Sequence, residues 1–196
     1  MNAMTGKLRI GLLGGSFNPA HAGHLHISLE ALKRLHLDQV WWLVSPQNPL
    51  KPTADMAPYK KRFASAKIMA SHERRIIVSD FEQRHGLKFT YATLNALKKR
   101  YPQNQFVWIM GADNLAGFHR WQRWRSIINI MPMVVFDRAP FSHTALRTCA
   151  ALALKNMRLP ENDIASIASR TKRWVYMYLL ARRHPASSTQ IRVGKR

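Results

Sequence analysis

Short apolar runs rich in β-branched and aromatic residues alternate along this chain with amphipathic segments of helical length. Such alternation is typical of a parallel β-sheet, because parallel neighbours need long crossover connections and these are usually helices. We therefore expect an α/β fold with a Rossmann-like, doubly wound parallel sheet. The predicted strands are residues 8–13, 40–45, 75–79, 106–110, 133–137 and 174–180. The predicted helices are residues 24–35, 59–71, 91–101, 121–128 and 145–154.

The length of the chain favours a single domain over residues 1–196, since 196 residues with 46% hydrophobic composition can build one well-buried core. The strand at 8–13 is almost entirely apolar, which predicts burial on both faces and a place at the centre of the sheet. Ligands of open α/β sheets bind beyond the carboxyl ends of the strands. Chemistry should therefore be sought in the loops after Leu13, Ser45, Ser79, Met110 and Leu180.

The N-terminal residues and the cysteine content predict a cytoplasmic protein. Cys149 is the single cysteine, so the chain cannot form an intramolecular disulfide or a cysteine-based zinc site. The first residues lack the pattern of a secretory signal, and no apolar run approaches the ~18 residues of a membrane span. The 31 Lys and Arg against 10 Asp and Glu give a formal charge of +21, which attracts phosphate-bearing partners without naming one.

The loop after the first strand reads GGSFNPAHAGH and carries the most informative residues. Gly14 and Gly15 can bring backbone N–H groups close to an anion where a helix begins. The loop is neither a P-loop, since it lacks GKS or GKT, nor a GxGxxG fingerprint. His21 and His24 are three residues apart, so both rings can point the same way at a helix start. Two such imidazoles can donate hydrogen bonds to phosphate oxygens.

This loop closely resembles the GGxFxPxHxGH signature of the T/HxGH nucleotidylyltransferase superfamily, which implies the HUP-type Rossmann-like fold. The resemblance assigns His21 and His24 to the α-phosphate of ATP. Near the C-terminus, ASSTQIR resembles the ISSTxIR motif with which the family grips the β- and γ-phosphates. Arg192 would be the triphosphate clamp, although the helical tail usual in the family is absent and the chain stops four residues later. The implied catalytic residues are His21, His24 and Arg192, and the implied ATP contacts are Gly14, Gly15, Ser16, Phe17, His21, His24, Gly111, Asp113, Ser187, Ser188, Thr189 and Arg192.

Three further segments are similar to bacterial nicotinate-nucleotide adenylyltransferases and indicate the acceptor. GADNLAGFHRWQRW resembles the family's GADNLxxFxxWxxW, in which Asp113 would bind ribose hydroxyls and Trp121 would stack on the pyridine ring. KFTYATL resembles YTxxTL and places Thr90 at the nicotinate carboxylate, and VSPQNPLKP makes Lys51 a candidate for phosphate contact. The expected partners are ATP and nicotinate mononucleotide, without a membrane partner.

The implied reaction needs no general base, because the acceptor phosphate is already an anionic nucleophile. Asp113 is the one carboxylate in the proposed site, so we expect Mg²⁺ to be carried by the ATP phosphates and water, with no metal ligands from the protein.

Several residues have a purely structural role as an alternative to the implied function, and the function itself has alternatives. Phe118, Trp121 and Trp124 at three-residue spacing could be one apolar helix face, and Lys51 could be an ordinary exposed lysine. The acceptor could also be nicotinamide mononucleotide or phosphopantetheine. A basic chain with six Trp and five Tyr could be an RNA-binding module, although it carries none of the usual RNA-binding motifs and we expect nucleic acid not to be its partner. The sequence does not determine the oligomeric state.

Overall fold

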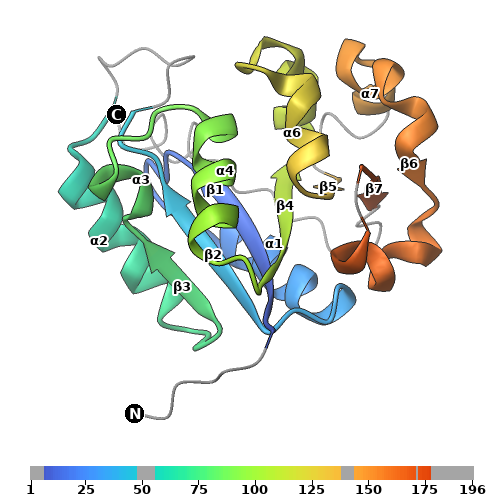
Figure 1. The fold of residues 1–196 in the computed structure, drawn as a ribbon. Coiled ribbons are helices and arrows are strands. Elements are labelled where there is room, and N and C mark those ends of the chain that lie inside the picture. The colour runs from blue at the N-terminus through green and yellow to red at the C-terminus, as the bar shows by residue number, and fades with distance from the viewer. Residues whose placement is uncertain (1–6, 48–55, 138–143, 171, 178–196) are drawn as a thin grey trace.

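The structure is a computed structural model that describes residues 7–47, 56–137, 144–170 and 172–177. One seven-stranded sheet runs through it, in the order β3-β2-β1-β4-β5-β7-β6, and every neighbouring pair is parallel (Figure 1). The strands are β1 (Arg9–Gly15), β2 (Gln39–Val44), β3 (Ile76–Ser79), β4 (Gln105–Gly111), β5 (Met133–Phe136), β6 (Arg158–Leu159) and β7 (Trp174–Met177).

The strand order confirms the doubly wound, Rossmann-like architecture. The chain moves outward from β1 through β2 to β3, and then returns to place β4 on the other side of β1. β1 therefore has a parallel neighbour on each side, as its apolar sequence predicts, although β4 is the middle strand of the order. The two-residue strand β6 was not predicted, because it is too short to show a periodicity.

The α-helices agree with the prediction at α1, α2 and α4 and differ from it in the second half of the chain. Predicted helix 121–128 begins later, at Trp124, because Arg123 adopts a left-handed conformation with φ 51° and Trp121 is extended. Predicted helix 145–154 is two short helices separated at Thr148, whose Oγ donates to the Ala145 carbonyl at 2.7 Å and competes with the helical pattern. The α-helices are α1 (Ala22–Arg34), α2 (Tyr59–Ala70), α3 (Phe81–Arg84), α4 (Thr90–Arg100), α5 (Ala112–Gly117), α6 (Trp124–Ile130) and α7 (Cys149–Ala153). The 3₁₀ helices are η1 (Phe118–Arg120), η2 (Ala145–Arg147), η3 (Lys155–Met157) and η4 (Glu161–Ser169).

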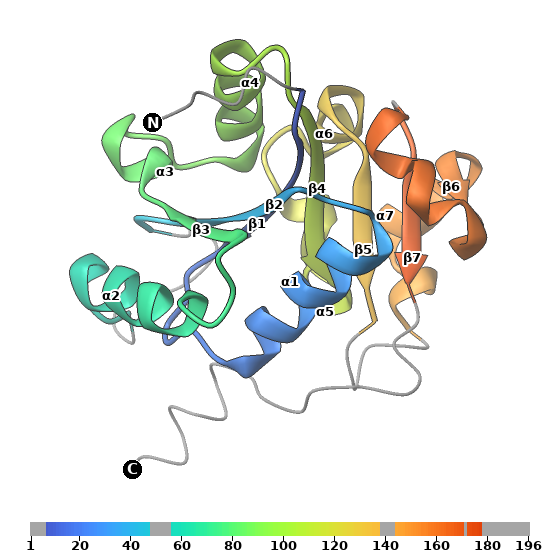
Figure 2. The ribbon, with the colours of Figure 1, turned by 90° about the horizontal axis from the view of Figure 1, so that it is seen from below.

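The helices cover both faces of the sheet and bury two apolar clusters against it. One cluster joins α1, α2 and η4 to one face, and the other joins α4, α5, α6 and α7 to the opposite face. Figure 2 shows α1 and α2 on one side of the strands and α4 and α6 on the other. No helix in the described residues combines the length and apolar character needed to span a bilayer.

Candidate active site

The candidate site lies where the strand order reverses, at the carboxyl ends of β1 and β4. These two strands are hydrogen-bonded neighbours with Leu13 opposite Ile109, so the loops that follow Gly15 and Gly111 leave the sheet side by side. In doubly wound sheets this switch point is the usual ligand-binding crevice. The first loop leads into α1 with its two histidines, and the second leads into α5.

His21 and His24 form a reciprocal cap at the start of α1. His21 is the N-cap residue, and its Nδ1 accepts a hydrogen bond from the Gly23 N–H at 3.1 Å. The Nδ1 of His24 accepts one from the His21 N–H at 3.3 Å, and the two ring centroids lie 3.9 Å apart. A neutral ring that accepts at Nδ1 carries its proton on Nε2. The backbone therefore selects, for both imidazoles, the tautomer that donates from Nε2.

Buried residues behind His24 hold its ring in place. Phe17 is 1% exposed, and its ring packs against both His24, at 4.7 Å, and Trp42, at 5.1 Å, whose own ring centroids are 6.0 Å apart. The Trp42 indole donates to Ser28 Oγ at 2.7 Å, and Ser28 Oγ donates to the His24 carbonyl at 2.8 Å. Phe17 was predicted as an ATP contact; because its ring is in the core, only its main chain is left to meet a nucleotide. The supporting roles of Trp42 and Ser28 carry no local sequence signal.

Gly14 is required by packing against Trp108. A Cβ atom at Gly14 would overlap the ring of Trp108, whereas a Cβ at Gly15 would meet Phe17 only at 3.4 Å, an ordinary contact. Trp108 also contacts Trp121, with ring centroids 6.1 Å apart and nearly perpendicular. Trp108 thus links the loop after β1 to the segment after β4 that was predicted to bind the acceptor.

Asp113 and Trp121 lie in the segment that follows β4. Gly111 is the N-cap residue of α5, and Asp113 lies in its first turn. Trp121 is partly buried and packs edge-on against Phe118, at 5.2 Å. Phe118, Trp121 and Trp124 do not form one helix face, because they belong to η1, an extended residue and α6 respectively. Phe118 and Trp124 are nevertheless core residues, and Trp121 packs against the same cluster.

Thr90 begins α4, and Thr93, one turn further along the helix, contacts a buried carboxyl group. Thr93 is fully buried, and its Oγ donates to Glu82 Oε1 at 2.8 Å. Burial raises the pKa of Glu82 to about 7, although the hydrogen bond from Thr93 opposes the shift. The Glu82 carboxyl, whose pKa is near neutral, therefore contacts α4 one turn after its first residue. Sequence reasoning missed this group.

Arg62 on α2 is the other residue that sequence reasoning missed. It is 2% exposed and donates hydrogen bonds to four main-chain carbonyls, those of Ser16, Ser45, Pro46 and Ala57. Burial lowers the pKa of its guanidinium. One of these carbonyls, that of Ser16, lies in the loop after β1.

The structure brings Gly14, Gly15, Ser16, Phe17, His21 and His24 together in one segment, which runs from the end of β1 to the first turn of α1, and Trp108 links this segment to Trp121. The predicted positions Lys51, Ser187, Ser188, Thr189 and Arg192 lie outside the described residues. In the part of the chain that the structure describes, His, Cys, Asp and Glu side chains form no group of three or more that could hold a metal ion.

Comparison with known proteins gives one consistent result. The cytidylyltransferase-like family model matches residues 12–194. A Methylorubrum extorquens protein named "Probable nicotinate-nucleotide adenylyltransferase" is 48% identical over 94% of this chain and 99% of its own length. A Parvibaculum lavamentivorans protein of the same name is 52% identical over 83% of this chain and 80% of its own. In fold, the chain resembles Plasmodium falciparum nicotinic acid mononucleotide adenylyltransferase solved with NaAD, with a TM-score of 0.72 and 15% identity over 95% of this chain and 83% of that one.

Proposed function

Because this chain belongs to the nicotinate-nucleotide adenylyltransferase family, we propose that it transfers the adenylyl group of ATP to nicotinate mononucleotide. The products are deamido-NAD and pyrophosphate, and the reaction is a step of NAD biosynthesis. The observation that carries this proposal is the reciprocal cap of His21 and His24, which supports two Nε2 donors at the carboxyl edge of β1.

The histidines act on the α-phosphate. The acceptor phosphate attacks the α-phosphorus in line, and pyrophosphate leaves. Negative charge on the transferring phosphoryl oxygens is then stabilised by the Nε2–H donors of His21 and His24, which were oriented before the reaction began. Catalysis by positioning and charge stabilisation suits a loop whose side chains are held by buried packing.

The remaining ATP contacts follow from the two loops and the C-terminal motif. Main-chain groups of Gly14, Gly15, Ser16 and Phe17 meet the nucleotide, together with Gly111 and Asp113 beyond β4. The C-terminal motif grips the triphosphate through Ser187, Ser188, Thr189 and Arg192, on the strength of the sequence resemblance.

The acceptor lies on the β4 side. Trp121 stacks on the pyridine ring, Thr90 meets the nicotinate carboxylate, Asp113 binds ribose hydroxyls and Lys51 binds the phosphate. This arrangement is supported by the contact of Trp121 with Trp108, which in turn packs on Gly14.

Magnesium accompanies ATP as a charge-neutralising ion held by phosphate oxygens and water. The donor set fits this role, because Asp113 is the single carboxylate among the proposed contacts and a resident Mg²⁺ site needs several oxygen ligands. We place the protein in the cytoplasm as a single-domain enzyme over residues 1–196. The lone Cys149 is compatible with that location.

The test is pyrophosphate release with ATP and Mg²⁺, comparing nicotinate mononucleotide, nicotinamide mononucleotide and phosphopantetheine at equal concentrations. We expect a strong preference for nicotinate mononucleotide. Preference for another acceptor would retain the histidine chemistry and refute the roles of Trp121 and Thr90. Absence of pyrophosphate release with all three acceptors would refute adenylyl transfer and favour the alternative of an RNA-binding protein. A filter-binding assay with RNA at physiological salt would test that alternative.

A further inference from the structure

Arg62 is a buried cation that donates hydrogen bonds to four main-chain carbonyls. It lies in the first turns of α2 and is 2% exposed. Its Nε donates to the Ala57 carbonyl at 2.9 Å, and its Nη2 donates to that of Pro46 at 2.7 Å. Its Nη1 donates to the carbonyls of Ser16, at 2.6 Å, and Ser45, at 2.8 Å. One planar group therefore joins the loop after β1, the residues after β2 and the residues before α2.

The chemistry of this position requires a guanidinium. Among the described residues no carboxylate forms an ion pair with Arg62, so its charge is stabilised by carbonyl dipoles and by the Tyr59 ring, 5.4 Å away. Burying a cation is costly, and an apolar side chain would fill the same space at lower cost. Only arginine offers donors in a rigid planar fork that can reach several carbonyls at once. The arrangement is therefore explained by the need to hold those carbonyls together.

The hydrogen bond from Arg62 to the Ser16 carbonyl determines the direction of the next backbone N–H in the loop after β1. In a trans peptide the C=O and the N–H point in opposite directions. Because the Ser16 carbonyl faces Arg62, the N–H of Phe17 faces away from α2. In the same way, the Gly15 carbonyl accepts from the Ser45 N–H at 2.9 Å, which turns the N–H of Ser16 away from β2.

Phe17 would not keep this conformation by itself. Its φ of 48° lies in the left-handed region, which is unfavourable for a residue with a large side chain. Arg62 restrains the peptide before Phe17, while Trp42 and His24 enclose its ring. The strained residue is thus held from both its main chain and its side chain.

Two more contacts attach the same loop to the α2 region. The Ala57 N–H donates to Asn18 Oδ1 at 3.2 Å, and the Ala20 N–H donates to Ser65 Oγ at 3.5 Å. Ser65 in turn donates to the Arg62 carbonyl at 2.9 Å. Together with the Ser16 contact, these bonds fix the loop up to the residue before His21.

From this geometry we infer that Arg62 is a positioning residue for the nucleotide: it holds the peptide between Ser16 and Phe17 so that the Phe17 N–H is presented to the phosphates of ATP. The inference rests on the proposed function, since it uses ATP as the ligand of this loop. Arg62 itself does not touch the substrate.

The experiment measures the affinity of a non-hydrolysable ATP analogue by calorimetry, without acceptor, for the wild type, Arg62→Lys and the control Ala66→Gly. Lysine keeps the charge but cannot reach four carbonyls, so we expect at least tenfold weaker binding and a matching rise in the KM for ATP. The KM for nicotinate mononucleotide should stay within about twofold. Ala66 lies one turn further along α2 and is fully buried, so its replacement should lower the Tm and leave analogue affinity unchanged.

Wild-type affinity in a folded Arg62→Lys variant would overturn the inference. Equal losses of affinity in Arg62→Lys and Ala66→Gly would also overturn it, because they would reveal only a general loss of stability. A wild type that does not bind the analogue would instead refute the proposed function. If Arg62→Lys does not fold, the backbone amide of Phe17 can be followed by NMR in the wild type during an analogue titration. A large shift of that amide supports the inference, and an unchanged amide contradicts it.

Discussion

His24 Nδ1 accepts a hydrogen bond from the backbone N–H of His21 at 3.3 Å, so one of the two histidines orients the other. His21 uses its own Nδ1 to accept from the Gly23 N–H. Both rings therefore serve as helix caps through one nitrogen and keep the other nitrogen as a donor. Helix initiation and the phosphate recognition that we propose would depend on the same side chains, and substitutions can separate the two roles.

Replacing His24 by Asn and by Gln should have opposite effects. The Asn Oδ1 can take the capping place of Nδ1 but offers no donor at the position of Nε2, so turnover should fall by about 10²-fold, as in His24→Ala, with little change in Tm. Gln reaches further and can donate near the Nε2 position, so it should retain more turnover than Asn while losing some of the cap and some stability. Initial rates measure the turnover of each variant, and thermal unfolding measures its Tm. Near-normal turnover in His24→Asn would contradict the assigned role.

Trp121→Ala should mainly raise the KM for nicotinate mononucleotide, by about tenfold. Stacking of a heteroaromatic ring on an aromatic side chain contributes on the order of 1–3 kcal/mol, and 1.4 kcal/mol corresponds to a factor of ten. Trp124→Phe is the matched control: Trp124 is 8% exposed and packs on Phe118, so its replacement should change Tm and not KM. If Trp121→Ala moved only the KM for ATP, the stacking role would be wrong.

Glu82 should make the protein less stable as the pH rises. Its pKa is about 7 in the folded protein and 4.5 for an unperturbed glutamate, so the folded state binds more protons between these pH values. The contribution to the free energy of unfolding is fully present below the unfolded pKa and is lost as the pH rises through about 7. Between about pH 5 and about pH 8 the loss should be on the order of 2 kcal/mol.

Glu82→Gln keeps the shape and the acceptor for Thr93 while removing the titration. Urea unfolding should show the variant more stable than the wild type at about pH 8, with the gap much smaller at about pH 5. Identical dependence of the unfolding free energy on pH in the two proteins would show that the pKa of the Glu82 carboxyl is not shifted.

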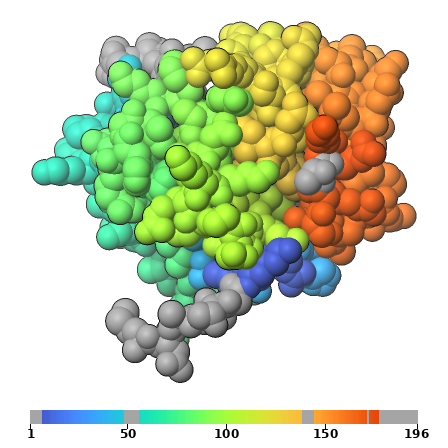
Figure 3. All heavy atoms as spheres, viewed as in Figure 1, coloured from blue at the N-terminus to red at the C-terminus, as the bar shows by residue number. Residues whose placement is uncertain are grey.

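The surface around α4 and α6 should attract the anionic substrates. Every Lys and Arg between Phe81 and Asp137 is exposed, whereas none of the carboxylates in this stretch is. Figure 3 shows α4 in green beside α6 in yellow on one face. Contacts between the two helices include Arg123 over the Tyr91 ring and a hydrogen bond from Lys98 to the Ile130 carbonyl. The cations are Arg84, Lys88, Lys98, Lys99, Arg100, Arg120, Arg123 and Arg125.

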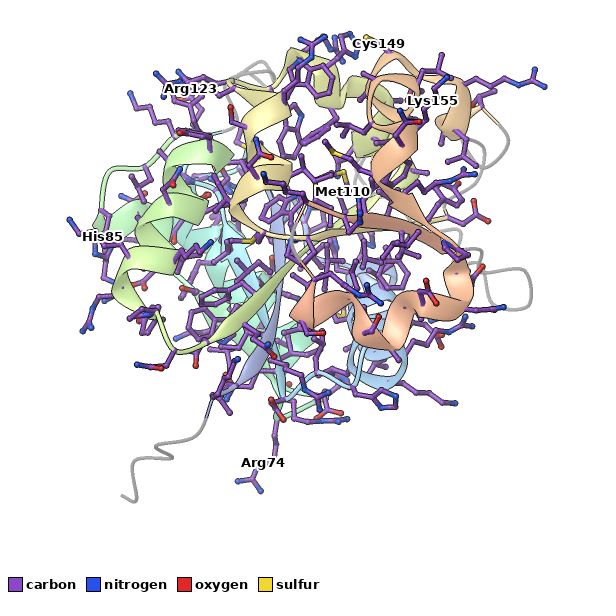
Figure 4. The ribbon with its side chains drawn as sticks, turned by 45° about the vertical axis from the view of Figure 1, so that its right-hand side comes forward. Arg74, His85, Met110, Arg123, Cys149 and Lys155 are labelled. Carbon is purple, nitrogen blue, oxygen red and sulfur yellow. The ribbon has the colours of Figure 1, made fainter. Side chains whose placement is uncertain are left out.

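Arg123→Glu should therefore lower kcat/KM about threefold at low salt, and the difference should fade toward about 0.5 M salt as the charges are screened. Arg74→Glu changes the net charge equally, but Arg74 precedes β3 and lies at the opposite end of the molecule from Arg123 (Figure 4). Steady-state rates over a salt series compare the two. Equal effects of the two substitutions would indicate net charge alone, with no local steering.

The sequence by itself determined every strand except β6, the order of the motifs and the segments to which the proposed chemistry is assigned. Buried parallel strands are continuous apolar runs, so local composition marks β1, β2, β4 and β5 almost to the residue. The glycine-led loop after β1 and the capping histidines are also local features, because a helix start depends on residues within one turn of it.

Only the tertiary structure decided which residues support that chemistry. In the sequence Arg62 is one Arg among 31 Lys and Arg, for which a solvated surface place is the ordinary expectation, yet in the structure it is 2% exposed. Its carbonyl partner Ser16 is 46 residues away, Trp42 is 14 residues from Ser28, and Glu82 is 11 residues from Thr93. Such contacts leave no periodic pattern in the amino-acid sequence, because they form where separate strands and helices meet. The start of α6 at Trp124 was also missed, because it depends on the left-handed backbone of Arg123, which the apolar spacing does not show.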